Sequence, residues 1–437
     1  MGAEIVGERE KLAINGGAPV RIKPLPQEWC GAHHYDELEL EAVSRVVKAR
    51  SPFRYYGLDL QEEASKLEKE FAAYTGTGHA LAVSSGTAAL QVSLGALGVG
   101  PGDEVILPGY FWVATVGAVV RSGAIPVLVD SDDTWSIDPG KVESKITKRT
   151  KAIITVHMGG VIGRIEELAA VARKHGVKVL EDCAQAAGAS QSGRKAGSFG
   201  DIAIFSFQLN KHMTSGEGGM VVTSDNALYR RAFAVHDLGY PRSESGRLEL
   251  NDPSLQLWGI GCRMSELTAA VLRVQLGKLD GICGAMRSAK NQVKEALVDV
   301  KELKFRRVVD ASGDAGSFLL VTLPTRKLSL EFVKALRAEG IVADKGGMYP
   351  IHMDDWGLHI YYNVPSLVNK RGISTVTTWA LAENDASKVD YRKGACPCID
   401  SMLEKTILMC VASTLSGSDV DDIIKAFRKT SEHFFQE

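Results

Sequence analysis

Between about residue 60 and residue 225, segments with a strand-like pattern of apolar residues alternate with segments with a helix-like pattern. Short apolar runs predict buried strands, and longer segments with apolar residues three or four positions apart predict helices. The predicted strands are 80–84, 103–107, 125–130, 151–156, 177–181, 202–207 and 219–223, and the predicted helices are 60–74, 87–97, 112–122 and 165–175. Strands that alternate with helices predict an α/β fold with helices around a mainly parallel, seven-stranded sheet.

The C-terminal third has a more mixed pattern. A helix is predicted over 265–279, where Leu267, Val271 and Val274 share one face. Further helices are predicted over 288–298, 329–339 and 419–434, with a strand over 317–322. We therefore expect an N-terminal arm (1–35), a large domain (36–285) and a smaller C-terminal α/β domain (286–437).

Composition excludes several classes of protein. The 437 residues are 45% hydrophobic and 24% charged, and 51 basic against 53 acidic residues leave a net charge of −2. This balance predicts no binding to nucleic acid or to an anionic membrane. No apolar run is long enough to span a bilayer and no signal pattern opens the chain, so a cytoplasmic protein is expected. The seven cysteines lack the paired spacing of a zinc site, and no metal is expected.

Three short segments carry candidate chemistry, and each follows a predicted strand. The first is Ser84-Ser85-Gly86-Thr87, where small residues precede a helix. Backbone N–H groups and the positive end of a helix dipole at such a turn favour a phosphate. An N-cap and a tight turn without a ligand explain the same residues equally well.

The second segment is the apolar strand that ends in Glu181-Asp182. A carboxylate buried at a strand end is costly unless it meets a cation, and a protonated pyridine nitrogen is one such partner. An Asp that only caps the following turn is the alternative for Asp182 taken alone.

The third segment places Lys211 four residues after the apolar run 202–207 and before Gly216-Glu217-Gly218-Gly219. Covalent catalysis on carbonyl compounds needs a lysine amine with a lowered pKa near the edge of a sheet. A solvated loop lysine is the better interpretation of any such residue in isolation. The three segments together are more specific than any one of them.

Taken in order, these segments resemble the pyridoxal 5′-phosphate (PLP) enzymes of fold type I, and more narrowly the DegT/StrS-type sugar and aminocyclitol aminotransferases. The resemblance covers nearly the whole chain. It includes 12–17, 53–57, 84–87, 181–186, 205–207, 216–219, 263–266, Cys396-Pro397 and 421–424.

The resemblance implies a role for each candidate. Lys211 would bond PLP as a Schiff base and move a proton, and Asp182 would pair with the pyridine nitrogen. Gln185 would lie near the ring's phenolic oxygen, and Trp112 would stack on the ring unless it is a core tryptophan. Gly86 and Thr87 in the turn and Ser206 in the strand before Lys211 would hold the phosphate, and Ser85 would also bind the cofactor.

The resemblance also implies the reaction. An amino group would pass from L-glutamate or L-glutamine to a keto sugar or keto cyclitol, in a homodimer with shared active sites. Gly261 stands where the family usually has an Asn that reaches the neighbouring subunit's phosphate, which puts that contact in doubt. A PLP-dependent lyase, dehydratase or carbon–carbon bond-forming enzyme is an alternative, and a non-catalytic regulatory relative is another.

Overall fold

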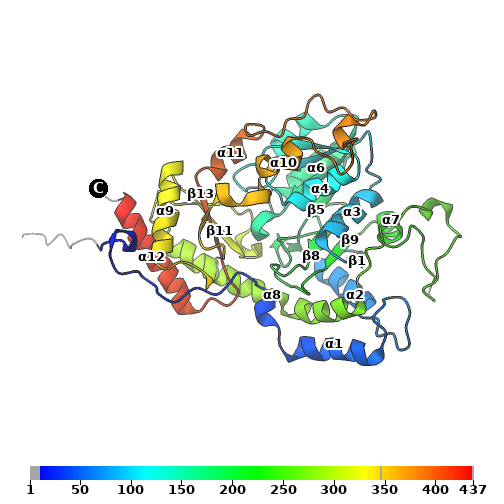
Figure 1. Ribbon diagram of the computed structural model, residues 1–437, viewed down its shortest axis with the longest axis horizontal. Helices are drawn as coiled ribbons and strands as arrows, with labels where there is room; N and C mark the ends of the chain where they lie inside the picture. The colour runs from blue at the N-terminus through cyan, green and yellow to red at the C-terminus, as the bar shows by residue number, and fades with distance from the viewer. Residues whose placement is uncertain (1–9, 244, 345–346, 436–437) are drawn as a thin grey trace, which may run out of the picture.

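One sheet holds all seven predicted strands. The computed structural model describes residues 10–243, 245–344 and 347–435 (Figure 1). Neighbouring strands pair in parallel except where β9 is involved, and the order is β1-β9-β8-β5-β4-β2-β3. In that order the strands are His79–Val83, Gly219–Thr223, Ile202–Ser206, Lys178–Asp182, Thr150–Val156, Glu104–Pro108 and Ile125–Val129. The predicted α/β class and the mainly parallel sheet are confirmed.

Two apolar cores form because successive strand residues point to opposite faces of the sheet. Val179 and Ala203 belong to one core, and their neighbours Leu180 and Ile204 belong to the other. The first core also holds apolar residues of α2 (Glu63–Thr75), α6 (Ile165–His175) and α8 (Glu266–Ala296). The second holds those of α3 (Gly86–Ala96), α4 (Val113–Arg121) and α7 (Asn226–His236). Both faces of the sheet are thus covered, as a parallel sheet requires.

A second, antiparallel sheet lies in the C-terminal part of the chain, in the order β10-β11-β13-β12. Its strands are Lys304–Phe305, Phe318–Thr322, Thr406–Cys410 and Ile351–His352. The helices α9 (Arg326–Ala338) and α12 (Gly417–Phe435) pack with it, and their apolar residues join the first core. The predicted C-terminal α/β unit is therefore present and shares a core with the large sheet.

Helix α8 differs from the prediction. The helices expected over 265–279 and 288–298 are a single helix of 31 residues, because no proline interrupts the sequence between them. The expected domain boundary at residue 285 falls inside this helix, and the division into domains stays a prediction. Helices α1 (Glu37–Ala49) and α7 and strand β13 were not among the predicted elements.

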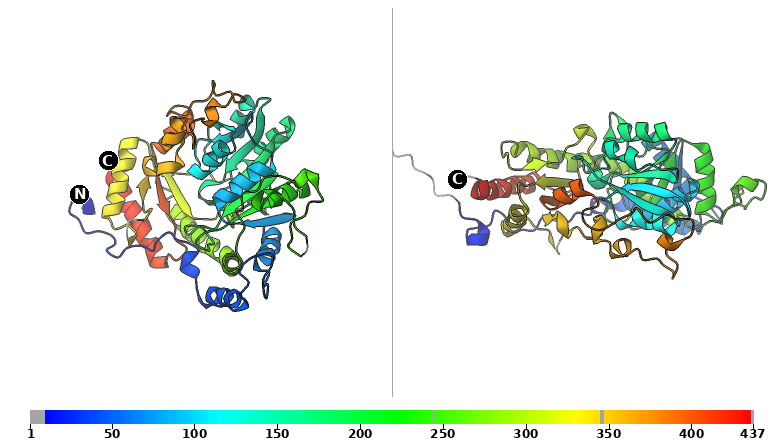
Figure 2. Two further views of the ribbon diagram at one scale, coloured as in Figure 1. Left: turned by 45° about the vertical axis from the view of Figure 1, so that its right-hand side comes forward. Right: turned by 90° about the horizontal axis from the view of Figure 1, so that it is seen from above.

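The arm before α1 runs across the C-terminal part of the molecule and reaches the loop that carries Lys211 (Figures 1 and 2). Leu25 N–H donates to the Val342 carbonyl at 2.8 Å, and Gly31 N–H donates to the Lys211 carbonyl at 3.1 Å. The Ser413 hydroxyl donates to the Cys30 carbonyl at 2.9 Å. The arm is therefore fixed between the two sheets.

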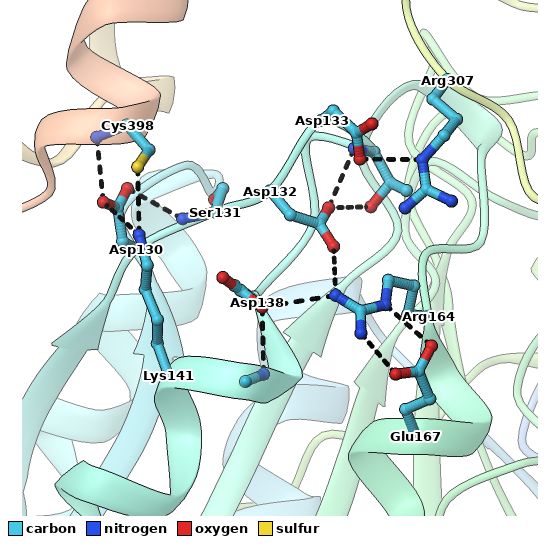
Figure 3. Close-up of polar contacts among 12 residues, drawn as sticks. Asp130, Ser131, Asp132, Asp133, Asp138, Lys141, Arg164, Glu167, Arg307 and Cys398 are labelled. Carbon is cyan, nitrogen blue, oxygen red and sulfur yellow. Dashed lines mark hydrogen bonds and ion pairs between the residues drawn. The ribbon is translucent and has the colours of Figure 1, made fainter.

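A polar network joins the C-terminal segment to the edge strand β3 (Figure 3). Asp130, just after β3, accepts hydrogen bonds from the N–H groups of Cys398 at 2.9 Å and Ile399 at 3.0 Å, in α11 (Pro397–Leu403). Lys141, in the short helix α5 (Pro139–Val142), adds an ion pair of 3.0 Å to the same carboxylate. The segment after β12 is thus anchored over the far edge of the large sheet.

Two further observations concern the cysteines and the apolar character of the helices. All seven cysteines lie in the described part of the chain and are free thiols, six of them buried. Among the described helices, none combines the length and the apolar character needed to cross a membrane.

A substitution at Phe71 tests the packing of the core beneath the Lys211 loop. The Phe71 ring is fully buried, and its centroid lies 4.9 Å from that of Phe205 and 5.6 Å from that of Phe207. We expect Phe71→Ala to lower the free energy of unfolding by about 3–5 kcal/mol through a cavity. Urea denaturation followed by circular dichroism measures the change. Leu38→Ala, at an exposed position of α1, is the control and should change it by less than about 0.5 kcal/mol. Equal midpoints for the two variants would contradict the prediction.

Candidate active site

A cavity of about 410 Å³ lies at the carboxyl ends of β4, β5 and β8. Open α/β sheets bind ligands at this edge, because the loops after parallel strands meet there. The cavity lining includes every candidate that the sequence predicted: Ser85, Gly86, Thr87, Trp112, Asp182, Gln185, Ser206 and Lys211.

Asp182, the last residue of β5, is 3% exposed. Its carboxylate accepts hydrogen bonds from the Thr115 hydroxyl at 2.7 Å and from Ala184 N–H at 3.1 Å. Burial raises the pKa of Asp182 above its usual range, and these two hydrogen bonds oppose the rise. The contact with Ala184 is the turn cap considered above, so Asp182 both closes the turn and lines the cavity.

Lys211 lies in the loop after β8, where its own N–H closes a turn onto the Gln208 carbonyl at 2.9 Å. Burial lowers the pKa of the Lys211 ammonium, and the nearby negative charge of Asp182 raises it. A lowered pKa increases the fraction of free amine, which is the nucleophilic form. Lys211 is thus not a solvated loop lysine.

The turn between β1 and α3 faces the same cavity. Ser85 is the N-cap of α3, and its hydroxyl accepts a hydrogen bond from Ala88 N–H at 3.0 Å. The N–H groups of the first turn of a helix have no partner within it and can serve an anion. A Cβ atom at Gly86 would lie 2.7 Å from the Ser206 Cβ, so this turn approaches β8 too closely for a larger residue. The capping interpretation and the anion-binding one are compatible here.

Trp112 precedes α4 and is 43% exposed, so it is not a core tryptophan. Its ring lies 4.6 Å from that of His359, centroid to centroid. The Gln185 amide group donates to His359 Nε2 at 3.5 Å, and its oxygen accepts from Gly159 N–H at 3.0 Å. Burial lowers the pKa of His359 to about 3, so the imidazole is neutral near pH 7. These three side chains form one wall of the cavity.

Buried groups behind β5 hold the strand that carries Asp182. Glu181 pairs with His157 Nε2 at 2.9 Å and accepts hydrogen bonds from the N–H groups of Gly197, Phe199 and Gly200. With Cys183 these two residues form a cluster of potential metal ligands. Because both oxygens of Glu181 already accept hydrogen bonds, we assign the cluster to positioning β5.

Sequence reasoning missed several residues of the lining. They come from the arm, from α4, from the loop of Lys211 and from the C-terminal part of the chain: Glu28, Thr115, His212, Ser317, Trp356 and His359. Each is an isolated polar or aromatic residue without a motif of its own. Only the path of the chain brings them to the cavity.

The fold and this site define an α/β enzyme with a half-buried lysine and a buried carboxylate facing one cavity. Residues 36–366 match the model of the DegT/DnrJ/EryC1/StrS aminotransferase family. The chain belongs to this family and is an aminotransferase-family enzyme.

Individual relatives extend over nearly the whole chain. An L-glutamine:2-deoxy-scyllo-inosose aminotransferase of Streptoalloteichus tenebrarius is 34% identical over 436 residues, which cover 97% of this chain and 98% of that protein. A GDP-perosamine synthase of Caulobacter vibrioides is 42% identical over 220 residues, 49% of this chain and 56% of the relative. The crystal structure of 3-amino-5-hydroxybenzoic acid synthase superposes with a TM-score of 0.76 at 28% identity, covering 95% of this chain and 100% of the other.

The charge of Asp182 should control the pKa of Lys211. We expect Asp182→Asn to lower the pKa of Lys211 further, because it removes the negative charge that favours the ammonium form. Reductive methylation of the cofactor-free protein over a pH series, read by peptide mass spectrometry, locates the midpoint. The midpoint for Lys211 should move to lower pH in the variant while exposed Lys48 labels as before. A midpoint that stays or rises would contradict the electrostatic argument.

Proposed function

We propose that this protein is a PLP-dependent aminotransferase that moves an amino group from L-glutamine to a keto cyclitol. The observation that carries the proposal is the placement of Lys211 and Asp182 on one buried cavity, beside the turn at Ser85–Thr87. Their pKa directions suit the task, because burial lowers the pKa of Lys211 and leaves more free amine.

The cavity fits PLP by the chemistry of its donors. The phosphate would be held by Ser85, Gly86, Thr87 and Ser206, at the close approach between α3 and β8. The pyridine nitrogen would pair with Asp182, the ring would lie against Trp112, and Gln185 would approach the phenolic oxygen. When bound, PLP supplies the electron sink that stabilises negative charge at the substrate carbon.

The chain's own groups supply the remaining chemistry. The Lys211 amine would hold the cofactor covalently and would move a proton at the substrate carbon. Asp182 would keep the pyridine nitrogen protonated, and the Thr115 hydroxyl holds that carboxylate in place. The arm and the C-terminal segment close the cavity and limit the access of water.

Support for the substrates comes from the relatives that match along their full length. Three of them, from Streptoalloteichus tenebrarius, Streptomyces kanamyceticus and Streptomyces paromomycinus, are named as L-glutamine:2-deoxy-scyllo-inosose aminotransferases at 33–34% identity. The match to the GDP-perosamine synthase covers only half of this chain. We therefore favour a cyclitol acceptor over a nucleotide sugar, and a cytoplasmic location that agrees with the free thiols.

One measurement distinguishes an aminotransferase from the two alternative functions. A lyase or a carbon–carbon bond-forming enzyme would not retain the amino group of the donor on the cofactor, and a regulatory protein would not react at all. Incubation with L-glutamine alone should convert the bound cofactor from its aldehyde to its amine form, followed by absorbance. We expect this conversion.

We further propose that the working unit is a homodimer with shared active sites. Exposed apolar side chains gather on two segments, 56–58 and 250–260. These side chains are Tyr56, Leu58, Leu250, Trp258 and Ile260. The chain that leads into the second segment lies beside the first, because a Cβ atom at Gly246 would lie 2.7 Å from the Tyr55 carbonyl oxygen. Exposed apolar residues at this density favour a protein interface. Gly261 adopts φ +66°, and a Cβ there would meet nothing within 4 Å, so the neighbouring surface stays open to a partner.

Lys211→Ala should reduce turnover by several orders of magnitude without unfolding the protein, because it removes the covalent amine. Borohydride reduction of the wild-type enzyme with PLP, followed by peptide mapping, should label Lys211. Lys141→Ala removes a lysine outside the cavity and serves as the matched control, with turnover retained. Label on another lysine, or turnover by Lys211→Ala, would overturn the assignment.

Trp258→Asp should shift the protein toward monomer, because a charge would replace a 94% exposed indole on the proposed interface. Sedimentation velocity at micromolar protein measures the shift. Ile373→Asp changes a residue that is also largely exposed but lies outside the two segments, and should leave a dimer. A wild-type protein that is monomeric and fully active would sink the proposal of a shared site.

A further inference from the structure

Four residues of the cavity lining have a buried polar atom with no hydrogen-bond partner in the described structure: Glu28 Oε2, His212 Nδ1, Ser317 Oγ and Trp356 Nε1. None of them belongs to the groups assigned above to the phosphate, the pyridine nitrogen or the ring. Leaving a buried polar atom unpaired costs about 1–3 kcal/mol, so such atoms in a cavity indicate ligand partners. We assign this part of the cavity to the substrate.

The position of Glu28 is set by the arm. Gln27 Nε2 donates to the Asp344 carbonyl at 3.0 Å on one side of it, and Gly31 N–H donates to the Lys211 carbonyl on the other. A Cβ atom at Gly347 would lie within 3.0 Å of Glu28 Oε2, so the glycine lets the backbone pack against one oxygen of the carboxylate. Gln27 and Gly31, which lie on either side of Glu28 in the chain, thus hold Glu28 at the cavity, and Gly31 is the residue that hydrogen-bonds to Lys211.

Glu28 is the charged member of this group. The pKa of His212 is lowered to about 4 by burial and by Lys211, so the imidazole is neutral near pH 7. Ser317 and Trp356 carry no charge. Lys211 is the sole lysine or arginine among the described residues that line the cavity, whereas Glu28, Asp182 and Glu217 are acidic. A carboxylate accepts hydrogen bonds from amides and hydroxyls and repels carboxylates and phosphates.

We propose that Glu28 determines the charge of the substrates that the site accepts. It accepts a hydrogen bond from the side-chain amide of L-glutamine in the first half-reaction and from acceptor hydroxyls in the second. It disfavours L-glutamate as donor and phosphorylated sugars as acceptors. This inference rests on the proposed function, because it assigns a specificity residue to the same cavity.

The donor half-reaction tests Glu28 directly. The rate of conversion of the bound cofactor is measured against concentration for L-glutamine and for L-glutamate, in the wild type and in Glu28→Gln. The wild type should prefer L-glutamine. The variant should lose about ten- to a hundredfold of that preference, mostly through KM, because a hydrogen bond to a charged group is replaced and the repulsion is removed. Glu41→Gln, an exposed position on α1, is the matched control and should keep the wild-type preference.

A binding measurement without turnover tests the second part of the inference, the hydrogen bond from acceptor hydroxyls to Glu28. Calorimetry should detect weaker binding of myo-inositol, an unreactive cyclitol, to Glu28→Gln than to the wild-type holoenzyme, by roughly tenfold or more. Glu28→Asp keeps the charge and should retain the preference for L-glutamine even if kcat falls. This second variant also separates loss of charge from a local change in the arm.

The outcomes distinguish the two proposals. A wild-type enzyme that takes an amino group from no amino acid would overturn the proposed function itself. A wild-type enzyme that reacts but prefers L-glutamate would overturn both the role of Glu28 and the choice of L-glutamine as donor, while the aminotransferase reaction itself would stand. A Glu28→Gln variant with unchanged preference and unchanged myo-inositol affinity would overturn the role of Glu28 alone. Loss of the preference in Glu28→Asp to the same extent as in Glu28→Gln would also overturn it, because the charge would then not be the cause.

Discussion

Two ionisable groups of opposite charge that line one cavity, the buried Asp182 and the half-buried Lys211, set the main constraint on this structure. Each is costly inside a protein when alone, and burial moves the two pKa values toward the neutral forms. Proximity and the hydrogen bonds from Thr115 and Ala184 oppose that tendency for Asp182. The fold therefore uses a strand end, a helix start and a loop to hold the Asp182 carboxylate near an amine whose pKa burial lowers.

The parallel sheet provides the positions, and the rest of the chain provides the enclosure. The ends of β4, β5 and β8 and the turn before α3 meet at one edge, as the alternation of strands and helices requires. An edge of this kind is open by itself. It becomes a cavity because the arm and the segment after β12 are tied across it, through Gly31 near Lys211 and through Asp130 at α11. Catalytic groups and enclosing groups thus come from different parts of the sequence.

That division explains what the sequence could predict. Strands such as 202–207 and motifs such as Ser84–Thr87 depend on neighbours in the chain, so local patterns predicted the large sheet and marked Asp182 and Lys211, whereas Gln185 was predicted from the family resemblance. Helix α8 was predicted in two pieces, because Gly281 and Gly284 weaken the helical signal without breaking the helix. Glu28 and His359 reach the cavity only through tertiary contacts, and no local pattern marks either of them.

The route of the arm has a consequence for the order in which the protein becomes functional during synthesis. The arm is made before the two sheets, yet its partners are Lys211, Val342 and Ser413, and Ser413 follows Cys30 by 383 residues. Contacts between such distant residues form late, since the chain must first close long loops. A nascent chain can fold the large sheet and present Lys211 while the cavity still stands open. The arm gains its last partner only after Ser413 has been made, so an exposed amine on shorter nascent chains is the hazard that this topology brings.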